Sequence, residues 1–137
     1  MDISVNMLAV VVAAIAAFVV GFLWHGPVFG AQWMKMMGIT KADMEAAKKQ
    51  PMGGKMVGAF AQQLVIAFVL AQFASVWGAV DVMGALTLTF WIWLGFMAAI
   101  LFDGVLWEKR TMNLYLFNIA YRFVSLAVMA VILVMWK

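Results

Sequence analysis

Several polar side chains lie within, or at the foot of, long apolar stretches of this chain. The most unusual is Arg122, which lies nine residues beyond Asn113 and so about 14 Å into the last stretch if it is helical. Hydrocarbon makes a charged side chain expensive, so such a residue is expected to face a partner or a ligand. Tyr115, Asn118 and Ser125 follow the same helical spacing, which predicts a polar stripe that faces other helices.

A carboxylate lies at nearly the same depth in the preceding stretch. Asp103 comes four residues before Trp107, and counting from the turn at 108–112 puts it level with Asn118, about 7 Å shallower than Arg122. A guanidinium on a flexible stem can bridge that distance. Two glutamines of the second stretch and the histidine at the foot of the first lie at comparable depth. The sequence therefore predicts one polar cluster from all four helices: His25, Gln62, Gln63, Asp103, Asn118 and Arg122.

Two functions are compatible with such a cluster. A guanidinium among amides suits the binding or permeation of a small polar or anionic solute, or a proton relay, and histidine readily changes charge near neutral pH. Alternatively, an ion pair and interhelical hydrogen bonds could only hold the helices together, as in an accessory or structural subunit. Solute binding is our first hypothesis, and the structural role stays open as the second.

Catalytic and metal-binding motifs are absent from the sequence. It has no cysteine and one histidine, and it contains no nucleophile elbow, phosphate loop or HExxH motif. Thirteen methionines suggest Cu(I) ligation, but their irregular spacing is more typical of flexible apolar packing. We therefore expect no enzymatic activity, no metal, no cofactor and no nucleic-acid partner.

The composition excludes a water-soluble fold. Apolar residues make up 68% of the 137 residues and charged residues only 11%, whereas about a quarter of a soluble domain is charged. Four apolar stretches reach the roughly 20 residues that a membrane-spanning helix needs. Short connections at 78–81 and 108–112 require antiparallel neighbours. The chain is thus expected to form one all-α membrane domain over residues 1–137, an antiparallel bundle of four transmembrane helices with spans at about 4–24, 55–77, 82–107 and 113–136.

A polar segment at 25–54 separates the first two spans. Gly26 and Pro27 end the first helix, and a short amphipathic helix that lies in the headgroup layer is expected to follow and to end at Gly38. Thr40 and Asp43 have the spacing of a capping box and predict a second short helix.

Basic residues predict the orientation in the membrane. Seven of them lie in the 25–55 segment and the 108–112 turn: Lys35, Lys41, Lys48, Lys49, Lys55, Lys109 and Arg110. The other side has only Lys137, so the positive-inside rule predicts that both termini face away from the cytoplasm. Four aromatic residues are expected to anchor the cytoplasmic interface: Trp24, Phe29, Trp33 and Trp107.

Small residues recur every four positions in the first span, at Ala9, Ala13, Ala17 and Gly21, and Gly54 and Gly58 open the second. Such rows let helix backbones approach closely, either within the bundle or between two copies of the chain. A bundle this small leaves much helix surface uncovered. We therefore expect two kinds of partner for this surface: the lipid bilayer and further copies of the same chain.

One run at the end of the first span combines aromatic and turn residues: Trp24-His25-Gly26-Pro27-Val28-Phe29-Gly30-Ala31-Gln32-Trp33, followed by Gly38. It resembles the opening signature of a bacterial membrane family called domain of unknown function 1761, whose members are similar in length and in having four hydrophobic spans. The resemblance implies a multi-pass protein of the bacterial inner (cytoplasmic) membrane and brings no established activity. We expect the segment to form a lid over the polar cluster.

Overall fold

The computed structural model describes residues 5–136, and every regular element in that range is a helix. Four helical segments are long and apolar enough to cross a membrane: Met7–Val28, Gly53–Trp77, Val82–Trp107 and Met112–Met135. They confirm the all-α prediction with four spans, and the boundaries agree with the expected ones to about one helical turn.

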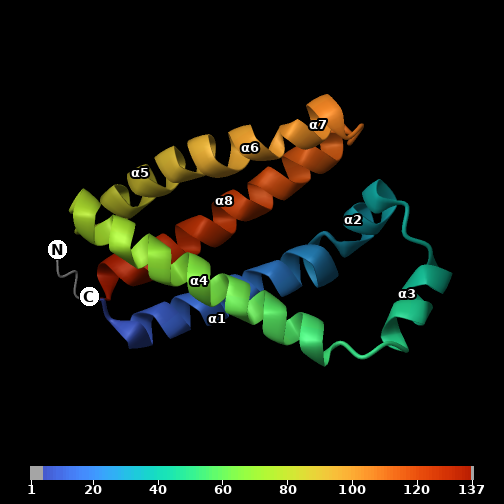
Figure 1. Cartoon of the computed structure of the whole chain (residues 1–137), viewed down its shortest axis with the longest axis horizontal. Coiled ribbons are helices and arrows are strands. Elements are labelled where there is room, and N and C mark those ends of the chain that lie inside the picture. Colours follow the sequence, from blue (N-terminus) through green and yellow to red (C-terminus); the bar gives the residue numbers. More distant parts are fainter. Residues whose placement is uncertain (1–4, 137) are drawn as a thin grey trace.

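The elements follow one another as α1 (Met7–Leu23), a π-helical turn (Trp24–Val28), α2 (Gly30–Met37), α3 (Lys41–Lys48), α4 (Gly53–Trp77), α5 (Val82–Trp93), a second π-helical turn (Leu94–Ala98), α6 (Ala99–Leu101), α7 (Asp103–Trp107) and α8 (Met112–Met135). Helix α8 is central, since it packs against α1, α4 and α5 (Figure 1). The α5–α7 segment runs along one side of α8, and α1 lies on the other.

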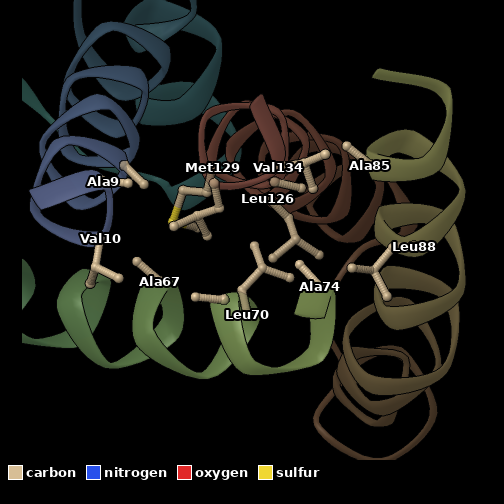
Figure 2. Packing of buried hydrophobic residues seen from close by; sticks show 14 of the residues in the cluster. Ala9, Val10, Ala67, Leu70, Ala74, Ala85, Leu88, Leu126, Met129 and Val134 are labelled. Atoms are coloured by element: carbon tan, nitrogen blue, oxygen red, sulfur yellow. The ribbon is translucent and has the colours of Figure 1, made fainter. Parts of the chain in front are cut away.

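Small side chains form much of the contact between α1, α4 and α8. Ala13 and Ala17 are fully buried, and Ala67 and Met129 complete the core between these helices (Figure 2). Lipid tails are as apolar as the side chains, so close van der Waals packing replaces the hydrophobic effect as the main attraction. The small-residue row of the first span therefore serves packing within the chain, whereas a β-carbon on Gly54 or Gly58 would meet nothing within 4 Å.

The start of α1 and the end of α8 lie together. Asn6 caps α1 by accepting hydrogen bonds from backbone N–H groups, and its Nδ2 donates to the carbonyl oxygen of Trp136 at 3.4 Å. The opposite end of the molecule carries α2, α3 and the turn between α7 and α8 (Figure 1). The basic loop and the basic turn are therefore at the same end of the four spans.

Local signals in the loop form as expected. Gly26 leaves helical geometry (φ −120°, ψ −107°) and breaks the first span, and Gly38 ends α2 with φ 69°, a left-handed conformation that suits glycine. Thr40 accepts from the Asp43 backbone N–H while the Asp43 side chain accepts from the Thr40 N–H. The capping box at the start of α3 is thereby confirmed.

Two side-chain hydrogen bonds join α8 to the third span. Trp93 Nε1 donates to the carbonyl oxygen of Ile119 at 2.7 Å, and Tyr115 Oη donates to that of Ala98 at 2.6 Å. Ala98 ends the second π-helical turn, a kind of irregularity that often occurs at functional sites. These bonds fix α5 and the following turn against the middle of α8.

Candidate functional site

Four of the six predicted polar residues line one groove between α1, α4 and α8: His25, Gln62, Gln63 and Arg122. Its volume is 310 Å³, and Phe18, Phe22 and Met56 supply apolar walls. The other two residues, Asp103 and Asn118, line a separate cavity of 330 Å³ between α7 and α8. The single cluster expected from sequence is therefore divided in two.

The arrangement around α8 explains this division. Asp103 begins α7, which lies on the side of α8 away from α1 (Figure 1). Counting residues along a span predicts how deep a side chain lies in the membrane. It does not predict which neighbouring helix that side chain faces. Asp103 and Arg122 therefore line different cavities.

Arg122 carries a positive charge into the α1–α4–α8 groove. Its guanidinium carbon lies 5.2 Å from the centre of the Tyr121 ring, a cation–π contact with its own neighbour. Within residues 5–136, it forms no ion pair and donates no hydrogen bond; the ion pair in that range joins Arg110 to Glu108 at 3.3 Å. The half-buried guanidinium thus lacks the carboxylate partner that a helix-bracing role would require.

Gln63 lines the same groove and has an unsatisfied acceptor. The residue is 5% exposed, and its Oε1 is buried with no hydrogen-bond partner in the described part of the chain. A buried polar group left unsatisfied costs about 1–3 kcal/mol. Gln62, by contrast, is exposed and lines the groove at its accessible side. A ligand that donates an O–H or N–H would satisfy the Gln63 carbonyl.

His25 lies in the first π-helical turn and also lines the groove. Its Nδ1 is 3.0 Å from the carbonyl oxygen of Gly21. A carbonyl can only accept, so Nδ1 carries the proton in this contact. This contact with its own helix orients the imidazole ring beside the groove.

Aromatic rings hold this turn against α8. The Trp24 ring lies 4.6 Å from Phe29 and 5.8 Å from Phe117, and the His25 ring lies 4.8 Å from Tyr121. Sequence reasoning missed the role of Phe117 and Tyr121. Their spacing of four residues, next to Arg122 on one helix, is the signal that could have indicated it.

The residues predicted as interfacial anchors differ in their surroundings. Trp107 is 80% exposed at the end of α7. Trp24, Phe29 and Trp33 are half-buried; Trp33 packs edge-on against His25 at 5.3 Å, and Trp24 Nε1 is buried without a partner in the described range. No residue of α2 is among those that line the groove. In place of the expected lid, α2 supports the histidine that lines the groove.

The second cavity, between α7 and α8, is lined by exposed charges. Asp103, Glu108 and Arg110 surround it together with Asn118 and Tyr115. Several of these groups already have partners within the protein. Arg110 forms an ion pair with Glu108, and the Tyr115 hydroxyl donates a hydrogen bond to the Ala98 carbonyl. Within residues 5–136, no three His, Asp or Glu side chains group as a metal site would require. The α1–α4–α8 groove, with its unpaired cation, is the stronger candidate.

Comparison with known proteins gives a family. No curated protein and no solved structure matches the chain. The family described as "Protein of unknown function (DUF1761)" matches residues 8–134, a range that includes the groove and nearly all of the four spans. The chain therefore belongs to the DUF1761 family.

Proposed function

We propose that this protein binds a small polar or anionic group in the α1–α4–α8 groove. The observation that carries the proposal is that two residues with unsatisfied polar groups line one groove. These groups are the guanidinium of Arg122 and the buried Oε1 of Gln63. An anion that also has an O–H or N–H would bind both. Charge-assisted hydrogen bonds are about twice as strong as neutral ones, and low surrounding polarity strengthens them further.

Binding is favoured over passage across the membrane in this conformation. Beyond Arg122, Leu126 and Met129 are no more than 2% exposed and pack with Ala13 and Ala67. This core occupies the space between α1, α4 and α8 toward the chain ends. The core therefore closes the path between α1, α4 and α8 beyond the groove.

An accessory role, in which buried polar residues only brace the helices, has less support. The hydrogen bonds from Trp93 and Tyr115 and the alanine-rich core join α8 to its neighbours. Neither Arg122 nor Asp103 contributes an ion pair within residues 5–136. These contacts join the helices without Arg122 or Asp103, which favours a binding role for the groove.

We infer that the groove opens on the cytoplasmic side of a bacterial inner membrane. The α2–α3 segment and the α7–α8 turn contain Lys35, Lys48, Lys49 and Lys109, and they lie at the end of the molecule opposite the start of α1 and the end of α8 (Figure 1). Short loops rich in Lys and Arg favour the cytoplasmic side. Both termini are then on the outer face.

The test uses the full chain in a neutral detergent with inorganic phosphate as probe. Phosphate is expected to raise the melting temperature of the wild type and of Arg110→Gln, an exposed arginine outside this groove. Arg122→Gln should remove the response; Arg122→Lys, which keeps a charge without the planar fork, should retain part of it. Equal responses in the wild type and Arg122→Gln would overturn the proposal.

A further inference from the structure

We propose that the occupant is an acidic lipid: its anionic headgroup binds Arg122, a headgroup hydroxyl donates to Gln63, and one acyl chain lies in a second groove between α4 and α5. This inference rests on the proposed function, because it names the source of the anion. Three features carry it: an apolar groove, its place one helical turn beyond the polar groove along α4 and α8, and the position of both within the membrane spans.

The second groove is wholly apolar. It has a volume of 360 Å³ and lies between α4, α8 and the α5 end of the third span, with Ile66, Val69, Phe73, Phe96 and Leu126 among its walls. From Val65 to Phe73 it extends about 12 Å along α4. This shape and chemistry suit a hydrocarbon chain.

The polar and apolar grooves follow one another along the same two helices. Gln62 and Ile66 are four residues apart on α4, and Arg122 and Leu126 are four residues apart on α8. Residues at this spacing lie on one face of a helix, about 6 Å apart along its axis. Since α4 and α8 run in the same direction (Figure 1), both steps lead from the polar groove to the apolar one. Figure 2 shows Leu126 of α8 directed toward Leu70 of α4, the floor of the apolar groove.

The depth of the site favours a lipid over a dissolved ion. Arg122 is ten residues into α8, about 15 Å from its start. Phe22 and Met56 form part of the groove wall and are 64% and 43% exposed, so the groove adjoins lipid-facing surface. A bilayer component can enter from that side without leaving the membrane. Any lipid can cover an apolar groove, but an unpaired guanidinium and an unpaired buried carbonyl select an anionic headgroup with a donor.

The experiment measures binding of the first lipid to the purified full chain by native mass spectrometry in a neutral detergent. Dioleoylphosphatidylglycerol is the probe, because its headgroup is anionic and has hydroxyls. Dioleoylphosphatidylcholine has the same chains but is zwitterionic and lacks a donor. We expect the acidic lipid to bind about tenfold more tightly, and Arg122→Gln to abolish that preference. Equal affinity of the two lipids for the wild type would overturn the inference.

Two matched pairs of variants separate the head and the chain. Gln63→Leu should weaken binding of the acidic lipid about threefold to tenfold, whereas Gln72→Leu, on the same helix but lining neither groove, should leave it unchanged. Val69→Trp fills the apolar groove and should weaken both lipids, while Val76→Trp, outside that groove, should not. If Val69→Trp and Val76→Trp behaved alike, no acyl chain would occupy this groove and the inference would fail.

The phosphate response distinguishes this inference from the proposed function. If phosphate stabilises the wild type through Arg122 but the two lipids bind equally, the groove binds a dissolved anion and only the lipid proposal fails. If neither phosphate nor the acidic lipid depends on Arg122, both proposals fail.

Discussion

Gly21 of α1 lies directly against the hydroxyl of Tyr121 of α8: a β-carbon built on Gly21 would lie 2.8 Å from Tyr121 Oη. The carbonyl of the same glycine accepts the hydrogen bond from His25 Nδ1. One residue without a side chain thus permits the approach of α1 to α8 and orients the histidine beside the groove. Positions far apart in the sequence meet here, and they determine the shape of the site.

Gly21→Val is expected to destabilise the protein. The added side chain must displace the Tyr121 ring, which is 8% exposed and has little room to move, so overpacking should cost about 1–3 kcal/mol. Unfolding of the purified protein in detergent measures the loss. Gly58→Val is the control, because a β-carbon there meets nothing within 4 Å. Equal losses in the two variants would show that the contact with Tyr121 is not the cause.

Arg122→Leu should leave the ligand-free protein as stable as the wild type, or make it more stable. The guanidinium has no hydrogen-bonded or ionic partner within residues 5–136 to lose, and leucine avoids a charge inside the membrane. The melting temperature without phosphate measures this directly. A marked fall in stability, with no change in phosphate binding, would instead favour the accessory role.

Trp93→Phe should weaken the attachment of α5 to α8. The variant keeps an aromatic ring but loses the 2.7 Å hydrogen bond to the Ile119 carbonyl, at an expected cost of about 1 kcal/mol. Trp91→Phe is the matched control, since Trp91 is 55% exposed two residues away. Thermal unfolding of both variants tests the prediction, and a loss in Trp91→Phe of the same size would contradict it.

The start of α3 should depend on pH through Asp43. Its hydrogen bond from the Thr40 backbone N–H, and then that from the Thr40 side chain, lower the pKa of the carboxyl below its ordinary value of 3.8. A lowered pKa means that the stabilisation is fully present above the ordinary value and is lost as pH falls through the lower one. NMR signals of the α3 amides should therefore report fraying only below about pH 4. Asp43→Asn should remove this transition; an unchanged transition would assign it to another group.

Membrane orientation can be tested with introduced cysteines, because the chain has none of its own. Glu45→Cys lies in the basic α3 segment, and Val80→Cys lies in the opposite turn at a position that is 75% exposed. A membrane-impermeant maleimide added to intact bacterial cells should label Val80→Cys and spare Glu45→Cys until the membrane is opened. The reverse pattern would invert the proposed topology.

Much of the fold depends on signals that act locally. Gly26 and Gly38 set backbone breaks, and Thr40 with Asp43 caps a helix, through contacts within a few residues of each position. The four spans follow from the length of uninterrupted apolar sequence, because a buried backbone in lipid must satisfy its own hydrogen bonds as a helix. Helical rise also converts residue number into distance along each span, which is the basis of the predicted depths.

The sequence by itself therefore determined four apolar helices and, to about one helical turn, their limits. Only the tertiary structure decided which polar residues share a site. With α8 between α1 and the α5–α7 segment, Arg122 lines a groove with Gln63 and His25 while Asp103 lines another cavity. The physical reason is that lipid covers any apolar face equally well, so hydropathy does not determine the rotation or neighbours of a helix. Close packing of small residues, such as Ala13 and Ala17, determines them.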